Sequence, residues 1–448
     1  MEEIIDKIQD LLKEKKFFEL KKYLENIEPE DIAIILNEVS EEECVIIYRL
    51  LNKDVASDVF VELDSDIQEK LIGFFTDREL KEVLDEIFLD DTADIIEEMP
   101  ANVVKRILKN IDKNDRKIVN ELLKYPEDSA GSIMTPEFID FKEDMTIKDA
   151  FDKIRRVGED KENIYTGYVL TKTRKILGKV DVEDMILAND DDNITEIMKK
   201  DIIVVNTYDD QEEVVKKLEK YDEFVLPVVD TEERLVGIIT VDDAIDVMQE
   251  ETEEDFEVMA AVTPSDESYF KTSVLTHAKN RFVWLLLLMI SSTLSGAIIN
   301  HYESAFAALP ILVAFLPMIM DTGGNCGSQA STLIIRGLAT DEIKMKDIFK
   351  VIWKELRVAL IVGVILALVN GIRIYIQYRQ LNVAFIVSLT LICTVVLSKL
   401  IGCTFPIVAK KIKLDPAIMA APLISTIVDS TSVFILFNIA LLIIGKVA

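Results

Sequence analysis

The last third of the chain consists of long apolar runs, each close to the roughly 20 apolar residues that an α-helix needs to cross a bilayer. Five segments of this kind are predicted, at about 281–300, 306–335, 351–377, 383–409 and 416–445. Inside a bilayer the backbone must satisfy its own hydrogen bonds, which a helix does within one segment. The sequence therefore predicts a multidomain integral membrane protein whose residues 279–448 form a five-helix transmembrane domain.

Two acidic residues lie within these apolar segments. Asp321 belongs to the stretch PMIMDTGGNCGSQASTLIIRGLA, and Asp429 belongs to LISTIVDSTSVFILF. A charge at bilayer depth is costly unless it faces a wet cavity, a partner or an ion, so both residues are functional candidates. For Asp321 a second interpretation stays open, in which it caps an interruption of the helix through Thr322 and the following amides.

Proline and small residues surround both acids, and these residue types loosen helices. Pro317 and Pro422 are expected to free backbone carbonyls, and Gly323 and Gly324 are expected to permit a close approach of the backbone. Carboxylates and free carbonyls together predict an oxygen-lined path for cations.

Charge divides the chain into two parts. Residues 271–448 contain 8 acids and 16 lysines and arginines, whereas residues 1–270 contain 73 and 34, so the two parts carry about +8 and −39 of the net charge of −31. The strongly acidic part, residues 1–270, is expected to repel nucleic acid and to attract cations. The sequence has no Cys/His metal spacing, no nucleophile–base pattern and no phosphate-binding loop, so an enzyme is not expected.

Basic residues set the expected orientation in the membrane. They precede the first and third spans and separate the fourth from the fifth: Lys271, Lys279, Arg281, Lys344, Lys346, Lys350, Lys354, Lys410, Lys411 and Lys413. Because cytosolic loops are enriched in basic residues, the N-terminus is expected in the cytosol and the C-terminus outside. The first residues form an amphipathic pattern without the features of a signal peptide. The expected location is the plasma membrane, with several spans.

Residues 1–129 repeat a short helical pattern: DIAIILNEVSEEE, DVASDVFVELDSD, DTADIIEEMPANV and DRKIVNELLKYPED. Each repeat holds one or two amphipathic turns closed by acids or proline. Such units bury their apolar faces by stacking on their neighbours, which predicts an acidic all-α helical superhelix. An ordinary helical bundle with acidic faces fits the same periodicity.

Residues 130–252 contain a longer repeat of β-α-β-β-α type. GSIMTPEFIDFKEDMTIKDAFDKI matches TEIMKKDIIVVNTYDDQEEVVKKL, with Met134 and Met198 as equivalent points. This α/β repeat closely resembles a tandem pair of CBS domains. In that family the second copy's GIITVDD supplies groups for a nucleotide ribose and phosphate, here Thr240 and Asp243, which makes ATP a candidate ligand. The first copy has Asp181 where the hydroxyl belongs, which argues against nucleotide binding there.

Residues 243–278 are predicted to form a long, acidic connecting helix that overlaps the end of the second CBS copy. Its acids recur at i, i+3 and i+4, so several share one face: Asp243, Asp246, Glu250, Glu251, Glu254 and Asp255. Two like charges about 6 Å apart repel by roughly 2–3 kcal/mol at an effective dielectric constant near 20. The helix therefore needs counter-ions to pack, unless it is only a solvated run of charge.

The order of these parts resembles the MgtE family of magnesium transporters and channels along essentially the whole chain. The motifs that carry the resemblance are PMIMDTGGN, the adjoining STLIIRGLA, and DPAIMAAPLISTIVD. Cys326 and Ser328 stand where Ala and Asn are frequent in the family, and Asp429 is followed by Ser-Thr-Ser. The resemblance implies a homodimer in which Asp429 lines a pore and the segment with Asp321 and Asn325 forms the other wall.

The resemblance also implies a regulatory role for acids outside the membrane. In the family, equivalent positions of the helical domain and second CBS copy face the connecting helix through bound Mg²⁺; here they are Asp90, Asp91, Asp94, Asp210, Glu212 and Asp222.

Mg²⁺ prefers octahedral oxygen geometry and gives up water reluctantly, so a pore that holds the hydrated ion by carboxylates and carbonyls suits it. The expected function is a Mg²⁺-selective, channel-like transporter for magnesium uptake. It would close when cytosolic Mg²⁺ bridges the helical, CBS and connecting-helix acids. Two alternatives stay open: an ion-coupled divalent-cation exchanger, and a membrane-anchored CBS nucleotide sensor whose spans only anchor it.

Overall fold

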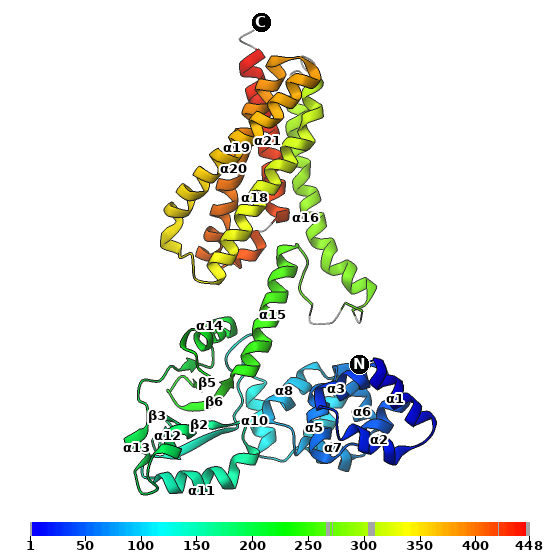
Figure 1. Cartoon of the computed structure of the whole chain (residues 1–448), viewed down its shortest axis with the longest axis vertical. Coiled ribbons are helices and arrows are strands. Elements are labelled where there is room, and N and C mark those ends of the chain that lie inside the picture. Colours follow the sequence, from blue (N-terminus) through cyan, green and yellow to red (C-terminus); the bar gives the residue numbers. More distant parts are fainter. Residues whose placement is uncertain (1, 266–268, 271, 303–309, 420, 445–448) are drawn as a thin grey trace. The chain divides into compact units, whose positions relative to one another are not determined.

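The computed structural model describes residues 2–265, 269–270, 272–302, 310–419 and 421–444. The chain divides into two compact units, which we call the acidic unit (Met1–Gln249) and the membrane unit (Glu250–Ala448). Figure 1 shows the elements of both, and each unit is described by itself below.

The acidic unit begins with ten short helices: α1 (Glu2–Lys13), α2 (Phe17–Leu24), α3 (Pro29–Glu38), α4 (Glu41–Tyr48), α5 (Lys53–Val61), α6 (Ser65–Phe74), α7 (Asp77–Leu84), α8 (Leu89–Glu98), α9 (Ala101–Asn110) and α10 (Asp115–Leu122). Local signals set several of their starts. Capping boxes formed by Ser40 with Glu43 and by Thr76 with Glu79 begin α4 and α7. Alternate helices stack in series, α3 on α5, α5 on α7 and α7 on α9. This serial stacking favours the predicted superhelix over a bundle.

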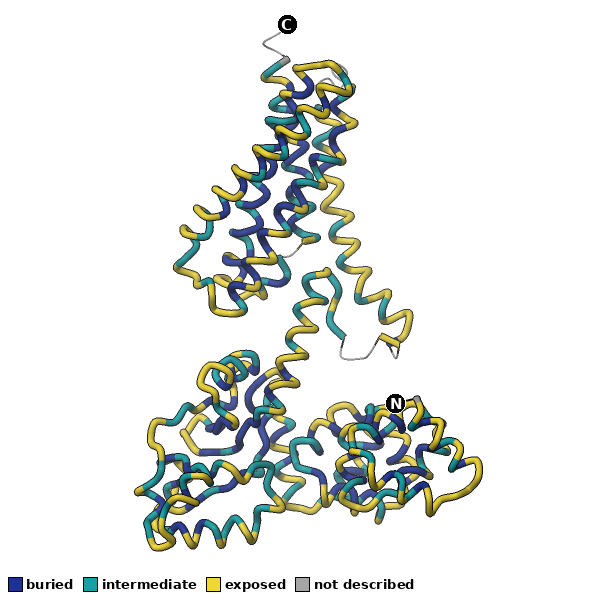
Figure 2. The backbone as a smooth tube through the Cα atoms, viewed as in Figure 1, coloured by how far each residue is buried: buried dark blue, intermediate teal, exposed yellow. Residues whose placement is uncertain are grey.

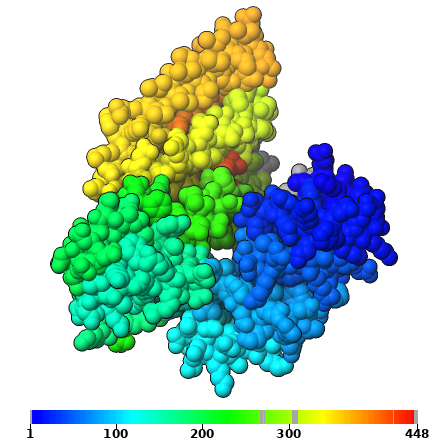
Figure 3. Space-filling model, turned by 60° about the horizontal axis from the view of Figure 1, so that its bottom comes forward, coloured from blue at the N-terminus to red at the C-terminus, as the bar shows by residue number. Residues whose placement is uncertain are grey.

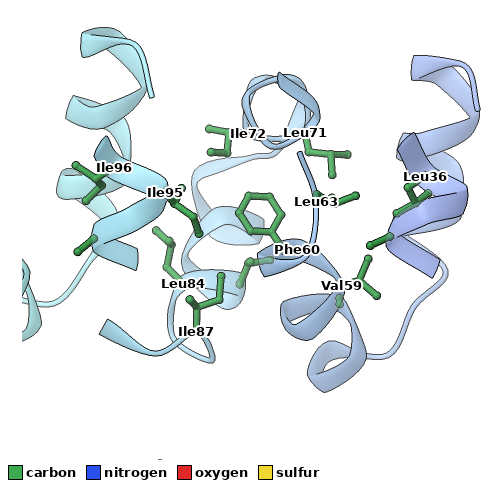
Figure 4. Close-up of a cluster of buried hydrophobic side chains, with 14 of the residues drawn as sticks. Leu36, Val59, Phe60, Leu63, Leu71, Ile72, Leu84, Ile87, Ile95 and Ile96 are labelled. Carbon is green, nitrogen blue, oxygen red and sulfur yellow. The ribbon is translucent and has the colours of Figure 1, made fainter. Parts of the chain in front are cut away.

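The core of this helical domain is built from the apolar stripes of these helices. Phe60 lies at its centre, fully buried, with side chains from α3, α6, α7 and α8 around it (Figure 4). The Gln68 side chain donates a hydrogen bond of 2.8 Å to the Phe60 carbonyl and so satisfies a polar group inside this core. The helices therefore hold one another as a scaffold for the acids on their surface.

Two small three-stranded sheets follow, and they confirm the predicted β-α-β-β-α repeat. The first copy contains β1 (Phe138–Lys142), α11 (Ile147–Val157), β2 (Asn163–Leu170), β3 (Ile176–Asp181) and α12 (Val182–Leu187). The second contains α13 (Ile194–Ile197), β4 (Val205–Asn206), α14 (Gln211–Tyr221), β5 (Val225–Val229), β6 (Leu235–Thr240) and α15 (Val241–Met259). In each sheet the first strand pairs parallel to the second, and the second pairs antiparallel to the third.

The two copies are joined by the segments that precede them. Thr135, before the first copy, exchanges two backbone hydrogen bonds of 2.9 Å with Ile238 of β6. A Cβ on Gly237 would lie 2.7 Å from the sulfur of Met134, and one on Gly178 of β3 would lie 2.8 Å from that of Met198. The two methionines thus occupy equivalent places. Figure 3 shows the surface of the helical domain (blue to cyan) and of this pair (cyan to green).

The predicted connecting helix at 243–278 is shorter than expected. Helix α15 ends at Met259, and the next helix, α16 (Val274–His301), begins 15 residues later. Ala261 has a φ of 56°, and Pro264 cannot donate a helical hydrogen bond, so the helix does not continue. Residues 266–268 and Lys271 lie outside the described residues.

The membrane unit contains α16, the turn η2 (Pro310–Phe315), α18 (Leu316–Ala339), η3 (Met345–Asp347), α19 (Ile348–Tyr378), α20 (Leu381–Lys411), η4 (Pro416–Met419) and α21 (Ala421–Ile444). Four stretches of the described residues are long and apolar enough to cross a membrane: Val274–His301, Met345–Tyr378, Leu381–Lys411 and Pro416–Ile443. Helix α18 is not among these four, because its glycines and polar residues lower its mean hydropathy. The predicted second span also starts at residues 306–309, outside the described residues, so the count of five stays a prediction.

Helix α20 is the packing centre of the membrane unit. It contacts α18, α19 and α21, and it is the most buried of the four apolar stretches, whereas α16 is the least (Figure 2). Small residues let the backbones approach closely. A Cβ on Gly402 of α20 would lie 2.2 Å from the Gly327 carbonyl oxygen of α18, and a Cβ on Gly323 would lie 2.6 Å from Thr394. Helix α18 is thereby seated against α20 and α21.

Candidate cation sites and ion pathway

Five carboxylates of the acidic unit meet at the start of α8, and we call them the first acidic cluster: Asp90, Asp91, Glu137, Glu162 and Asp243. Helix α8 places Asp90 and Asp91 in its first turn. Its Leu89 amide donates to the Glu137 side chain at 2.8 Å, which ties the helical domain to the first CBS copy. Asp243, in the first turn of α15, accepts a hydrogen bond from the Thr240 hydroxyl.

Burial and mutual repulsion disfavour ionisation of this cluster. Burial, followed by the charge of Asp243, raises the pKa of Asp90 to about 7. Burial, followed by the charge of Asp90, raises the pKa of Asp91 and of Glu162 to about 8 each. Asp90 also has a buried carboxylate oxygen without a hydrogen-bond partner among the described residues. A cation would relieve both the repulsion and the unmet oxygen.

A second acidic cluster lies nearly one turn along α15, and sequence reasoning missed its members in the helical domain. It consists of Glu30, Asp54, Asp58, Glu62 and Asp246. Burial, followed by the charges of Glu30 and Asp246, raises the pKa of Glu62. Burial, followed by Asp54 and Glu30, raises that of Asp58. Asp54 and Asp58 are one turn apart on α5, whereas Glu30 joins them only because α3 stacks on α5.

The clusters suit a hydrated cation better than a bare one. Within the described ranges, no three His, Cys, Asp or Glu side chains are arranged to hold a metal ion directly. Both clusters nevertheless offer only carboxylate oxygens, which are the donors that Mg²⁺ prefers, and Mg²⁺ usually keeps several of its waters. The donor chemistry therefore fits Mg²⁺ held through water.

Three predicted cation residues have local roles at the ends of α14. Asp210 caps the start of the helix by accepting from the Glu212 amide at 3.1 Å, and Glu212 forms an ion pair with Lys216. Asp222 ends the helix with a φ of 53°. None of the interactions described for these residues brings them into either cluster.

The other predicted cation residues lie on α8 and on the later turns of α15. Asp94 lies one turn beyond Asp90 on α8, and its charge interacts with those of Asp90 and Asp243. Glu250, Glu251, Glu254 and Asp255 lie on the later turns of α15, where Glu251 and Asp255 are partly buried and Glu250 and Glu254 are exposed.

The two CBS copies differ at the candidate nucleotide position, as the sequence predicts. In the second copy Thr240 is buried and its hydroxyl contacts Asp243. In the first copy the Asp181 carboxylate accepts from Thr166 at 2.8 Å and from Lys199 at 2.7 Å. The first position is thus occupied by the chain's own ion pair.

The membrane unit brings the two predicted pathway acids close to each other. Asp321 and Asn325, one helical turn apart, are exposed on α18, and Asp429 is partly buried on α21. The charge of Asp321 reaches Asp429. The opposite face of α18, with Gly323 and Gly327, is packed against its neighbours. Helix α18 therefore presents polar side chains on the face that its own unit leaves open.

Two expectations about this region are wrong. Helix α18 runs unbroken from Leu316 to Ala339, so Asp321 caps no interruption there. Pro317 and Pro422 lie in the first turns of α18 and α21, where no helical hydrogen bond is lost. Thr322 donates to the Met318 carbonyl at 2.7 Å, so its hydroxyl is satisfied within the helix. Side chains, rather than freed carbonyls, supply the polar surface.

Sequence reasoning missed a buried ion pair in the membrane unit. The Lys399 ammonium of α20 lies 3.5 Å from a Glu355 carboxylate oxygen of α19. Both residues belong to apolar helices, so the rule that singled out Asp321 and Asp429 would have found them too.

The sequence of this chain matches known protein families in the helical domain, the CBS pair and the membrane unit. Residues 316–439 match a family model described as a divalent cation transporter, residues 27–128 match the MgtE intracellular N domain, and residues 130–191 and 194–250 match CBS domains. The magnesium transporter MgtE of Thermus thermophilus is 33% identical over 450 residues, which cover 100% of both chains. The chain belongs to the MgtE family. The MgtE of Bacillus subtilis is 31% identical over 98% of this chain and 97% of its own length.

The structural relatives agree with this membership. The cytosolic domain of the Mg²⁺ channel MgtE in complex with ATP has a TM-score of 0.52 and 36% identity, covering 54% of this chain and 99% of its own. The soluble part of a magnesium transporter has the same TM-score and 26% identity, covering 56% of this chain and 99% of its own. This chain is therefore a membrane-integral member of the MgtE family, and the relatives that it matches are named magnesium transporters.

The first acidic cluster predicts how stability depends on pH. Because the folded-state pKa of Asp91 is raised from 3.8 to about 8, its protonated form favours the fold. This stabilisation is complete below pH 4 and is lost as the pH rises through 8. In EDTA, the unfolding temperature of the acidic unit within the purified protein should decrease as the pH is raised from 5.5 to 8.5. At pH 8.5, added Mg²⁺ should reverse part of this decrease.

Asp91→Asn should flatten this dependence, whereas Asp10→Asn, at an exposed position, should not change it. A pH dependence that is equally steep in Asp91→Asn would show that the cluster is not its source.

Proposed function

We propose that this chain forms a Mg²⁺-selective, channel-like pathway for magnesium uptake. The observation that carries the proposal is the closeness of Asp321 and Asp429 in a unit of mostly apolar helices, with Asn325 one turn from Asp321. Carboxylate and amide oxygens attract a cation whose water shell stays largely intact, and two acids together favour a divalent ion. Asp429 is assigned the main role, because it is the more buried acid and its ionised form gains most from a passing cation.

The open polar face of α18 supports a homodimer. Asp321 and Asn325 would face lipid if the membrane unit stayed alone, and acids facing lipid are costly. A second copy related by a two-fold axis would cover this face with an identical one. Opposed carboxylates would then line a path on the axis, which agrees with the family resemblance.

We further propose that the acidic unit lies in the cytosol and senses Mg²⁺. The basic residues before α16 and α19 and after α20 support a cytosolic N-terminus and an extracytosolic C-terminus. Two clusters of buried or crowded acids meet α15 at Asp243 and Asp246, and α15 leads toward the membrane unit in sequence. Bound Mg²⁺ would hold the helical domain, CBS pair and α15 together and close the pathway.

Loss of Mg²⁺ would leave the clusters to repel and the pathway to open. To move a gate from 1:99 to 99:1, the ions must bind one state by about 5.5 kcal/mol more than the other. Several hydrated ions with modest preferences can supply this together. The cytosolic ion is then both cargo and regulatory ligand, which gives the cell feedback on its own uptake.

ATP is proposed as a second ligand of the CBS pair. The solved relative was crystallised with ATP, and Thr240 and Asp243 stand where the family supplies groups for a nucleotide. Asp243 would then serve both the nucleotide position and the first acidic cluster, so nucleotide would bias the same helix that Mg²⁺ holds.

The first prediction concerns the pathway. Asp429→Ala should reduce Mg²⁺ influx into proteoliposomes at least tenfold, a loss of about 1.4 kcal/mol or more of ion stabilisation. The Mg²⁺ influx of Asp429→Asn should lie between that of Asp429→Ala and that of the parent, because asparagine keeps an oxygen and loses the charge. Thr431→Val is the control, because the Thr431 hydroxyl on α21 donates to the Ile427 carbonyl and not to Asp429.

Wild-type influx in both Asp429 variants would contradict the assignment. In the same assay, influx that requires a counter-ion on the other side would favour an exchanger, and a wild-type protein that moves no Mg²⁺ would favour a sensor.

The second prediction concerns nucleotide. Thr240→Val should weaken ATP binding to the purified protein about tenfold in calorimetry, because the isosteric valine cannot form the hydrogen bond. Asp181→Asn changes the first copy, whose position is occupied by Thr166 and Lys199, and should leave ATP affinity unchanged. No heat with the parent protein at millimolar ATP would remove nucleotide from the mechanism.

The third prediction concerns the gate. Neutralising Asp243, Asp246 and Glu254 together as amides should abolish closure by Mg²⁺ on the cytosolic side, because the ions then no longer distinguish the closed state. Maximal influx should survive, since Asp429 is untouched. The control removes three exposed acids elsewhere: Asp10, Glu42 and Glu213.

Patch recording with Mg²⁺ on the cytosolic side gives the midpoint of closure. A midpoint that is unchanged in the triple variant would place the sensor outside the acidic clusters. A Glu-specific protease offers an independent view, since Mg²⁺ should protect residues 250–256 in the parent and less in the triple variant.

A further inference from the structure

Glu355 and Lys399 form a buried ion pair between two apolar helices of the membrane unit. Their charged atoms are 3.5 Å apart, and their side chains are only 11% and 6% exposed. A charged pair at such a place gains little net stability from its own attraction, because both ions lose their water. The attraction within the pair therefore does not by itself account for its presence.

The pair lies between two apolar clusters. One turn away along each helix, Ala359 and Val395 pack with Cys326 of α18. In the other direction along α20, Cys403 packs with Ile334 and Leu338 of α18. The apolar contacts on either side have no preferred direction and no charge to match. A single pair of opposite charges between them opposes sliding, since a shift of either helix separates the charges in a medium of low dielectric constant.

Helix α20 transmits its position directly to α18. At Gly402 the α20 backbone approaches the Gly327 carbonyl so closely that a Cβ would lie 2.2 Å from the oxygen. Gly327 is on the packed face of α18, and Asp321 and Asn325 are on its open face. A rigid helix that is seated on one side by backbone contact presents its other side at a fixed position.

We propose that Glu355 and Lys399 are positioning residues for the ion pathway. Their contact fixes α20 against α19, and the Gly402–Gly327 contact carries this register to α18, which holds Asp321 and Asn325 opposite Asp429. The inference rests on the proposed conduction through this face and adds residues that do not touch the ion. The pair acts by charge and direction, so an apolar pair of similar size cannot replace it.

Four variants test this role in proteoliposomes loaded with a Mg²⁺ dye. Glu355→Gln and Lys399→Met each leave one buried charge alone and should lower Mg²⁺ influx about tenfold or more. The exchanged pair, Glu355→Lys with Lys399→Glu, should recover influx to within about threefold of the parent, because the attraction is restored. The apolar pair, Glu355→Met with Lys399→Met, should recover thermal stability and assembly and leave influx low.

A second readout follows α18 itself. With Cys44, Cys393 and Cys403 replaced by Ala, Cys326 reports the α18–α20 seam, where it is buried. Its alkylation by a small maleimide should accelerate in the apolar pair and return to the parent rate in the exchanged pair. The parent's influx is measured first, since a parent that moves no Mg²⁺ refutes the proposed function and not the pairing.

Given influx by the parent, full influx in the apolar pair would show that the two residues only pack, and would overturn the proposal. Parent-like influx in both single variants would overturn it as well. If the single variants fail to fold, the comparison of the exchanged pair with the apolar pair still decides, because both keep the site without a lone buried charge.

Discussion

The arrangement of this protein depends on partly buried carboxylates that crowd together, and none of the interactions described for them is with a cation. In the acidic unit, Asp90, Asp91 and Glu162 crowd around the start of α8, and burial raises their pKa to about 7 or 8. The free-energy cost of such a cluster must be offset by other parts of the fold. The buried apolar side chains of the stacked helices supply this stabilisation. The cost is recovered only when protons or cations arrive, so the occupancy of the cluster and the order of the fold are linked.

The membrane unit treats its polar groups in two different ways. Glu355 and Lys399 are buried as a pair and neutralise each other, whereas Asp321 and Asp429 have like charges and repel. The paired arrangement suits residues that hold two helices in a fixed position, because their charges are already neutralised and a passing ion adds no stabilisation. The second suits a transient cation, because only an ion from outside relieves it. The glycine contacts between α18 and α20 then place Asp321 on the open face of α18.

Periodicity predicted most of the fold, and the reasons for its failures are local. The stacked helices, the repeated CBS copies and the equivalence of Met134 and Met198 follow from patterns that each segment carries by itself. The end of α15 does not, because it depends on the left-handed turn at Ala261 before Pro264. The prolines of α18 and α21 were misread for a related reason: a proline in a first turn starts a helix, and only its place distinguishes it from one that breaks it.

The candidate sites also divide into residues that a local sequence pattern marks and residues that only the fold brings together. Asp90, Asp243 and Asp429 stand out in the sequence by charge in an unusual place or by resemblance. Glu62 does not, because only the fold brings it near Glu30 of α3 and Asp246 of α15. Asp58 does not either, although the charge of Glu30 acts on it as well. Since α15 carries Asp243 to one cluster and Asp246, nearly one turn later, to the other, a single helix meets both groups of acids. Any ion that relieves one cluster therefore orders the helix that the other cluster also needs, and the charge of Asp246 also acts on Asp243, so the two sites are coupled.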